Sequence, residues 1–454
     1  MKARLDAIRE CFEGAIPATL ATCSADGTPN IAYISQVQYV DPEHIAFSFQ
    51  FFNKTRKNIL ENPFAQVILI HPGTAAQYRL SVQYLRTETS GPLFEMMKAK
   101  LAGIASHTGM SGVFRLQGSD LYRVLEVERL EGRSLPPAEP RANLLSALRA
   151  VVTRFPACGD LEALLQATLD GLDARFGIDH ATVLMLDGQG GRLYTVASRG
   201  YEASGVGSEI PLGQGVIGVC AREASPIRLG HMASEYAYSR AMREAAEQGG
   251  MGGQLETEIP FPGLPGAASQ IAVPIPGAQG QLGVLFAESR EHLRFGYDEE
   301  DALVVLGAHL GLAIQDLQAG EPAEAAIEPE PVAGPAPSPS EGRAVVVRYF
   351  PENDSVFLDG DYLIKGVAGS IFWTLAQEFV QKGRTDFSNR ELRLDPRIQL
   401  PALGDNLEAR LVLLARRLEE RGAAARLERT GRGRFRFRVD RPLELLEVPQ
   451  ASAR

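Results

Sequence analysis

Residues 18–63 read ATLATCSADGTPNIAYISQVQYVDPEHIAFSFQFFNKTRKNILENP, and this stretch decides the fold of the N-terminal part of the chain. Three β-rich runs occur at residues 18–23, 31–40 and 44–52, separated by turn-forming residues at 25–27 and 41–42. Gly, Pro and Asp between β-branched and aromatic runs are typical of an antiparallel meander. We expect the strands to form a small barrel, because closure removes the unpaired strand edges.

A basic turn, NKTRKN at residues 53–58, follows the third run. A helix is expected to begin there and to end near Asn62-Pro63. Cations and a hydroxyl beside the free N–H groups of a helix N-terminus favour a bound phosphate. The same residues also suit a solvated turn without a ligand, and the spacing alone leaves both interpretations open.

Residues 18–127 as a whole resemble the FMN-binding split barrel of the pyridoxamine 5'-phosphate oxidase superfamily, including the later strand that begins Gln77-Tyr78-Arg79-Leu80. The resemblance implies FMN as the cofactor. It implies that the cofactor-binding residues are Ser48, Gln50, Asn53, Lys54, Thr55, Lys57 and Gln77. The basic strand of the true oxidases is replaced here by NIAYIS at residues 30–35, and no counterpart of their substrate-phosphate arginines is found. Oxidation of pyridoxamine phosphate is therefore not expected.

A helical insertion is expected after the barrel strands, around residues 91–97 and 105–110. His107 in this insertion either approaches a flavin or is a solvated loop histidine. Nothing in the sequence around it decides between the two.

The composition indicates several folded units joined by linkers. The chain has 454 residues, of which 45% are hydrophobic and 22% charged, values close to those of soluble globular proteins. Residues 132–140 (GRSLPPAEP) carry three prolines in nine residues, which prevents a continued helix or sheet and suits a short linker. Residues 319–342, rich in Pro, Ala and Glu, cannot bury enough apolar surface to fold and are expected to be an extended linker. The folded units are then residues 1–131, 141–318 and 343–448.

Charge is unevenly distributed along the chain. Residues 343–454 contain 20 Lys and Arg against 16 Asp and Glu, a net charge of +4, so the total of −10 leaves −14 for residues 1–342. A basic C-terminal region favours contact with a polyanion such as a nucleic acid.

The sequence predicts a cytoplasmic protein without a metal centre. No uninterrupted apolar run reaches the roughly 18 residues of a membrane span, and the first residues lack the apolar core of a secretory signal. The four cysteines, Cys11, Cys23, Cys158 and Cys220, are scattered without a CxxC pair. We expect them to be buried free thiols.

The second unit contains helical segments within residues 144–178, a buried strand at 181–186 and a glycine-rich helix start at 213–220. Further runs follow at 226–229, 270–275 and 283–287, and a closing helix is expected at about 298–315. This order resembles a GAF domain, which implies a sensory or dimerising module with a small-molecule pocket. The G-x-G-x-x-G of residues 213–218 lacks the βαβ setting of a dinucleotide site. Cys220 is expected to be a core residue rather than a chromophore attachment site, and residues 234–269 form either a pocket lid or a surface loop.

The third unit is predicted to contain short strands at 345–349, 355–358 and 362–364 and a helix at 367–381. Capping boxes at Ser388/Glu391 and Asp405/Glu408 each begin a helix, the second running from Asn406 to Arg421. A hairpin closes the unit around TGRG at residues 430–433, with Phe pointing inward and Arg outward.

This order resembles the OmpR/PhoB-type winged-helix DNA-binding domain over residues 343–440, with RTGRGRFRFRV as the wing. The resemblance implies that the long last helix enters the major groove and that the wing contacts the backbone or minor groove. The DNA-binding residues would be Arg410, Arg416, Arg417, Arg429, Thr430, Arg432, Arg434 and Arg436. Glutamates and the exposed-looking Val412 and Leu413 share that helix, so a winged helix that contacts protein remains the alternative.

The fold class is therefore multidomain α/β and α+β: a split β-barrel, then a GAF α/β sensor fold, then a winged helix. We expect a one-component transcriptional regulator, acting as a homodimer, that senses a small molecule or redox state and binds DNA. One alternative is an FMN-dependent oxidoreductase with regulatory appendages, and another is a scaffold whose three units all contact proteins. A GAF ligand that shifts the dimer arrangement would control whether two winged helices engage DNA together.

Overall fold

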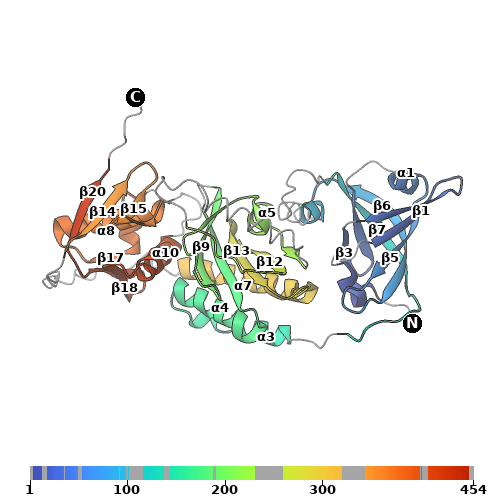
Figure 1. Ribbon diagram of the computed structural model, residues 1–454, viewed down its shortest axis with the longest axis horizontal. Coiled ribbons are helices and arrows are strands. Elements are labelled where there is room, and N and C mark those ends of the chain that lie inside the picture. Colours follow the sequence, from blue (N-terminus) through green and yellow to red (C-terminus); the bar gives the residue numbers. More distant parts are fainter. Residues whose placement is uncertain are drawn as a thin grey trace, which may run out of the picture.

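The computed structural model describes residues 4–12, 18–34, 36–49, 54–91, 93–98, 101, 116–137, 143–187, 191–230, 259–319, 343–398, 400 and 407–448. Figure 1 shows three units in a row, with the middle unit between the N-terminal and C-terminal ones. Residues 138–140 of the first predicted linker and 320–342 of the second lie outside these ranges, as do the predicted cofactor residues Gln50 and Asn53, His107 and most of residues 234–269.

The N-terminal unit is a seven-stranded antiparallel sheet in the order β2-β1-β5-β6-β7-β4-β3. Its elements are η1 (Leu5–Phe12), β1 (Ala18–Cys23), β2 (Pro29–Ile34), β3 (Val37–Asp41), β4 (His44–Phe49), α1 (Lys54–Glu61), β5 (Phe64–Ile70), β6 (Gln77–Glu88) and β7 (Gly118–Arg129). The predicted single strand at 31–40 is wrong, because β2 pairs with β1 and β3 pairs with β4 at opposite ends of the strand order.

One core lies inside this curled sheet. Side chains from six strands belong to a single buried cluster, among them Leu20, Ile45, Val67, Leu80 and Tyr122. The alternation of buried and exposed residues along β5 shows how period-two patterning places one face inward. A single core shared by strands across the whole order is what a barrel requires.

The middle unit is built on a six-stranded antiparallel sheet in the order β10-β9-β8-β13-β12-β11. Its strands are β8 (His180–Asp187), β9 (Arg192–Arg199), β10 (Glu209–Pro211), β11 (Ile227–Leu229), β12 (Ser269–Gly277) and β13 (Gly280–Ser289). Helices α3 (Leu144–Val152), α4 (Leu161–Phe176) and α7 (Tyr297–Ala319) share a buried cluster with one face of this sheet. Helix α5 (Gly215–Glu223) covers the other face.

Helix α7 lies unusually close to strand β12. A Cβ at Gly307 would lie 2.7 Å from the carbonyl oxygen of Pro274, and a Cβ at Gly311 would collide with that of Pro276. Among the described residues, α7 is the one helix whose length and apolar composition would suffice to span a membrane, which is weak evidence because a core helix has the same properties. No spanning segment was expected from uninterrupted apolar runs, because polar residues such as His309 interrupt the apolar sequence of this helix.

The C-terminal unit contains a four-stranded and a three-stranded sheet around three helices. The first sheet has the order β16-β15-β14-β20 and the second the order β17-β19-β18. The elements are β14 (Val345–Phe350), β15 (Ser355–Leu358), β16 (Asp361–Ile364), α8 (Val367–Lys382), β17 (Asp386–Ser388), α9 (Asn389–Leu394), α10 (Leu407–Glu420), β18 (Ala425–Gly431), β19 (Arg434–Val439) and β20 (Leu443–Glu447).

Several elements of this unit form where local sequence patterns predicted them. The capping box of Ser388 and Glu391 is present at the start of α9, and β18 and β19 form the predicted hairpin. Trp373 in α8 stacks on Tyr349 at 4.7 Å between ring centroids. Asp405 of the second predicted capping box lies outside the described residues.

Candidate functional site

The N-terminus of α1 contains the described part of the predicted phosphate turn. Lys54 is exposed at the first position of the helix, and Lys57, also exposed, lies 3.8 Å from Glu61. Thr55 is buried instead, where its hydroxyl accepts a hydrogen bond of 2.9 Å from the Asn30 amide. Lys54 and the free N–H groups of the first turn are therefore the groups at this end that can meet an anion.

A buried ion pair beside this turn was not predicted from the sequence. The Arg56 guanidinium lies 2.5 Å from the Asp120 carboxylate and donates a hydrogen bond of 3.0 Å to Thr87. It also stacks over the Phe49 ring at 3.9 Å. These contacts attach α1 to β6 and β7, so Arg56 has a structural role in holding the turn in place.

The strand ends beneath α1 provide further polar groups. Ser48, predicted as a cofactor residue, pairs across β4 and β7 with Ser119. The Ser119 hydroxyl is buried and has no hydrogen-bond partner in the part of the chain that the structure describes. Ser119 is the neighbour of Asp120, which pairs with Arg56 of α1. An exposed cation at a helix N-terminus and an unsatisfied buried hydroxyl on an adjoining strand suit the phosphate end of an FMN molecule.

Gln77 lies away from this group of residues. It begins β6 opposite Ile70, whereas Thr87, which contacts Arg56, lies near the far end of the same strand. At the rise of an extended strand, the two positions are roughly 30 Å apart. Within one chain, Gln77 therefore does not share a site with Lys54.

The middle unit contains a buried polar cluster on the sheet face that α5 covers. The Glu288 carboxylate is 1% exposed and accepts hydrogen bonds from the Leu264 backbone N–H at 2.8 Å and the Gln270 amide at 3.0 Å. Nearby, the hydroxyls of Thr182 and Tyr201 are buried, and the Tyr201 hydroxyl faces both Thr182 and Glu288. Burial, with the Glu288 charge close by, raises the pKa of Tyr201, which keeps its hydroxyl protonated.

Apolar side chains surround this cluster. Phe261 lies edge-on to Phe286 with 6.0 Å between ring centroids, and Cys220 is fully buried in the same cluster of side chains. Burial raises the pKa of the Cys220 thiol, in agreement with its prediction as a core residue. Apolar side chains around a few convergent polar groups are the usual composition of a small-molecule site.

The glycines at 213–218 shape the entry into α5. Gly213 and Gly215 have φ values of 81° and 58°, which side chains with a Cβ rarely adopt. A Cβ at Gly218 would lie 2.3 Å from the Pro211 carbonyl oxygen. These glycines therefore have a local structural role.

The hairpin of the C-terminal unit presents its predicted DNA-binding residues to solvent. Thr430, Arg432 and Arg434 are exposed. Arg436 is also exposed but pairs with Asp386 at 2.9 Å. The strict alternation of β19 buries Phe435 and Phe437 on its other face.

The predicted DNA-binding residues of α10 are placed differently. Arg410 and Arg416 are largely covered and pair with carboxylates of the middle unit. Arg417, also predicted to contact DNA, has a buried side chain that donates to the Leu363 carbonyl oxygen at 3.2 Å. Burial lowers the pKa of Arg417.

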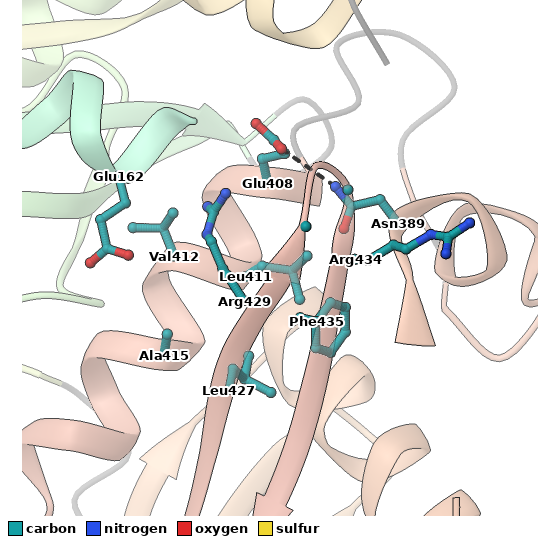
Figure 2. Close-up of a pocket in the computed structure, with 12 residues that line it drawn as sticks. Glu162, Asn389, Glu408, Leu411, Val412, Ala415, Leu427, Arg429, Arg434 and Phe435 are labelled. Atoms are coloured by element: carbon teal, nitrogen blue, oxygen red, sulfur yellow. Dashed lines mark hydrogen bonds between the residues drawn. The ribbon is translucent and has the colours of Figure 1, made fainter. Parts of the chain in front are cut away.

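A pocket of about 50 Å³ lies between α10, the hairpin and α4, as Figure 2 shows. Val412 and Ala415 of α10, Arg429 and Arg434 of the hairpin and Glu162 of α4 line it. It therefore spans the junction between the middle and C-terminal units. Among the described residues, no cluster of His, Cys, Asp and Glu suits a metal ion.

Sequence reasoning missed Arg56 with Asp120, and the cluster around Glu288. The strand LGVLFAE at 282–288 is apolar except for Glu288. A single charged residue in an otherwise apolar strand could have indicated the buried polar cluster around Glu288. The partner of Arg56 is 64 residues away in the sequence, so no local pattern could identify it.

Comparison with known proteins identifies two of the three units. Residues 5–134 match the family model described as Pyridoxamine 5'-phosphate oxidase, and residues 158–315 match that of the GAF domain. No match was found among curated proteins.

Solved structures resemble the same two units. An FMN-binding protein from Syntrophomonas wolfei is 18% identical, with 28% of this chain and 86% of that chain covered and a TM-score of 0.25. The GAF domain of a phosphoenolpyruvate-protein phosphotransferase from Acinetobacter is 20% identical, with 40% and 97% covered and a TM-score of 0.31. Free methionine-R-sulfoxide reductase from Neisseria meningitidis is 20% identical, with 40% and 95% covered and a TM-score of 0.31. Two successive parts of the chain are therefore similar to known families, the first to the pyridoxamine 5'-phosphate oxidase family and the second to GAF domains.

Proposed function

We propose that this protein is a cytoplasmic one-component transcriptional regulator whose C-terminal unit is a winged helix that binds DNA. The observation that carries this proposal is the hairpin of β18 and β19, which projects Arg432 and Arg434 into solvent from a unit of net positive charge. Exposed arginines on such a hairpin suit a phosphate backbone or a minor groove. The same unit used for protein contacts is the alternative.

The test of DNA binding uses the full chain and a fluorescein-labelled 40-base-pair duplex of mixed sequence. Arg432→Glu with Arg434→Glu should weaken binding at least tenfold, because two phosphate contacts are lost and two repulsions added. Arg343→Glu with Arg348→Glu, at exposed positions just before and within β14 in the other sheet of the unit, changes the charge equally and is the control. Equal affinities of the hairpin variant and the control would contradict DNA binding through the hairpin.

We propose further that the barrel binds FMN, with Lys54 and the first turn of α1 holding its phosphate. Bound FMN would supply transfer of one or two electrons, and thus a redox signal. Lys54 contributes a cation, Thr55 orders the turn through Asn30, and Arg56 fixes α1 to the strands.

The absorption spectrum of the purified protein tests this, followed by heat release and identification of any chromophore. Lys54→Ala should lower FMN affinity at least tenfold, as expected for loss of one charge-assisted contact of about 1.5–3 kcal/mol. Lys57→Ala, on the same helix but paired with Glu61, should have a smaller effect. A colourless protein that cannot be reconstituted with FMN would contradict the proposal and move sensing to the GAF pocket.

The alternative function is an FMN-dependent oxidoreductase with regulatory appendages. It predicts catalytic turnover of a reduced pyridine nucleotide with an external oxidant, unaffected by Arg432→Glu and Arg434→Glu. Steady-state turnover of the flavin-loaded full chain separates an enzyme from a sensor.

For the GAF domain we propose a small polar ligand on the α5-covered face. The Glu288 carboxylate would accept hydrogen bonds from the ligand, and the buried hydroxyls of Thr182 and Tyr201 would donate to it in place of their contacts with each other and with Glu288. These groups favour a ligand with both donors and acceptors, such as an amino-acid-like molecule. Thermal-shift screening of such compounds against the wild type and Glu288→Gln tests this, and stabilisation that is equal in both would contradict it.

A further inference from the structure

Helix α10 has two buried faces, although a helix of a single small domain usually needs one. Leu407, Leu411, Leu414 and Leu418 are buried as the predicted core stripe. Leu413, which the sequence suggested was exposed, is only 3% exposed. Together with Arg410, Arg417 and Glu420 it lies on a second face, at the spacing of residues that share one side of a helix.

The GAF domain covers this second face. At one end, Arg410 lies 3.1 Å from the Asp187 carboxylate and stacks over the Tyr194 ring at 3.7 Å. At the other end, the Ser204 hydroxyl donates a short hydrogen bond to Glu420. Between them, a Cβ built at Gly207 would come within 3.6 Å of both Leu413 and Arg417, which shows how closely the helix lies against the loop after β9.

Helix α4 contributes a second row of contacts. Arg416 lies 3.7 Å from Glu162, and Arg429 of the hairpin lies 3.1 Å from Asp160. Glu162 also lines the junction pocket, where Figure 2 shows it across from Arg429 and Val412. In both pairs the arginine belongs to the C-terminal unit and the carboxylate to the GAF domain.

Charge and apolar burial both extend across this junction. Residues 141–318 contain 12 Arg, no Lys and 21 Asp and Glu, a net charge of −9, opposite to the +4 of residues 343–454. Lys365, which follows β16, lies 3.2 Å from Glu209 in β10. The buried apolar side chains form one cluster that includes Val206 of the GAF domain and Leu413 of α10.

We infer that the acidic GAF surface formed by Asp160, Glu162, Asp187 and Glu209 is a docking site for the C-terminal unit and competes with DNA for α10. Arg410, Arg416 and Arg429 belong to the predicted DNA-binding residues and are bound to this surface instead. The docked arrangement is therefore a closed state in which only part of the hairpin is accessible. This inference rests on the proposed DNA-binding function.

A single loop connects the docking site with the GAF pocket. Tyr201, whose hydroxyl belongs to the polar cluster near Glu288, lies three residues before Ser204, which contacts Glu420 of α10. Gly205 of the same loop packs so closely on Pro262 that no Cβ fits between them. A ligand that moves Tyr201 would thus displace a loop that holds α10, which gives the closed state a release mechanism.

The experiment compares DNA affinities of full-length proteins by fluorescence anisotropy with the labelled 40-base-pair duplex at constant salt. Glu162→Lys with Asp187→Lys changes the GAF side alone and should tighten DNA binding at least tenfold, because α10 is released. Glu131→Lys with Asp316→Lys gives the same change of net charge away from the junction and is the control. Equal tightening in both pairs would overturn the inference.

A charge exchange at a pair outside the predicted DNA-binding residues provides a second test. Glu209→Lys alone should tighten DNA binding, and adding Lys365→Glu should reverse at least half of this effect, since the pair is restored with opposite polarity. An additive result would overturn docking through this pair. If no protein in either set binds DNA, the proposed function itself fails; if the wild type binds as tightly as the released variants, DNA binding stands and the docking inference fails.

Discussion

At the scale of single residues, the clearest structural contribution comes from charged groups that are paired away from solvent. Arg56 and Asp120 lie almost entirely inside the barrel unit, with side chains 16% and 8% exposed. Removing one partner of such a pair leaves an uncompensated buried charge, which costs far more than the intact pair contributes.

Arg56→Met should therefore destabilise the barrel by about 3 kcal/mol, since Asp120 loses its counterion. Hydrogen exchange of peptides from β6 and β7 measures this, with faster exchange as the expected result. Lys57→Met, which changes an exposed side chain one position along, should alter stability by less than about 0.5 kcal/mol. Similar exchange in the two variants would contradict a structural role for the pair.

Glu378 makes the stability of the C-terminal unit depend on pH. Burial opposes ionisation, but hydrogen bonds from Lys382 and Arg397 outweigh it and lower the pKa of Glu378 below 4.5. A lowered folded-state pKa means that the stabilisation is complete above the unfolded-state value and is lost as pH falls through the folded-state value.

The wild type should thus lose more stability between pH 6 and pH 3 than Glu378→Gln does. Fluorescence of Trp373, the single tryptophan of the chain, follows unfolding of this unit. Glu419→Gln, an exposed position in α10, is the control and should behave as the wild type does. Parallel pH profiles for the wild type and Glu378→Gln would show that Glu378 does not contribute.

At the scale of elements, close backbone approach determines how α7 lies on the GAF sheet. Gly311→Ala places a Cβ in collision with the Pro276 carbonyl oxygen and should destabilise the GAF domain by about 1–3 kcal/mol. Leu312→Ala, at a side chain that is 64% exposed, should have little effect. Differential scanning calorimetry of the full chain tests this, and an unchanged GAF transition in Gly311→Ala would contradict the close packing.

Elements with local signals were predictable from the sequence. The Ser388 capping box and the alternation of β19 specify their structures through neighbouring residues alone. Strand β20 was missed, because it pairs in parallel with β14, about 100 residues earlier in the chain. The second buried face of α10 was missed for the same reason, since only the fold brings the GAF surface to Leu413.

The candidate sites were predictable to a similar extent. The position of Lys54 at a helix N-terminus follows from the local pattern, whereas Gln77 was grouped with it by resemblance and lies at the far end of β6. Arg417 of α10 is buried against Leu363 of β16. The residue pattern along a helix does not show such a contact with a strand.

At the scale of the whole molecule, the barrel has an apolar outer face that suits a second copy of the chain. Ile31 and Tyr33 of β2 are 70% and 81% exposed, and Phe64 and Ile68 of β5 are 55% and 36% exposed. Strand β1 lies between β2 and β5, so these side chains belong to one side of the sheet. We propose that this face forms the homodimer contact, because contiguous exposed apolar surface favours association.

Ile31→Glu with Tyr33→Glu should convert the dimer into a monomer, since burying two carboxylates in an apolar contact is costly. Sedimentation equilibrium measures the change. Leu145→Glu, at a side chain that is 77% exposed on the GAF domain, is the control for an apolar-to-acidic change elsewhere. A wild-type chain that is monomeric at micromolar concentration would contradict the proposal.

The central claim is that a sensory barrel and GAF domain restrain a DNA-binding C-terminal unit. The most direct test is an anisotropy titration of the 40-base-pair duplex with the chain carrying Glu162→Lys and Asp187→Lys, with and without Arg432→Glu and Arg434→Glu. We predict that the first protein binds at least tenfold more tightly than the wild type and that the added hairpin substitutions abolish this binding. Absence of DNA binding by the released chain would contradict the claim.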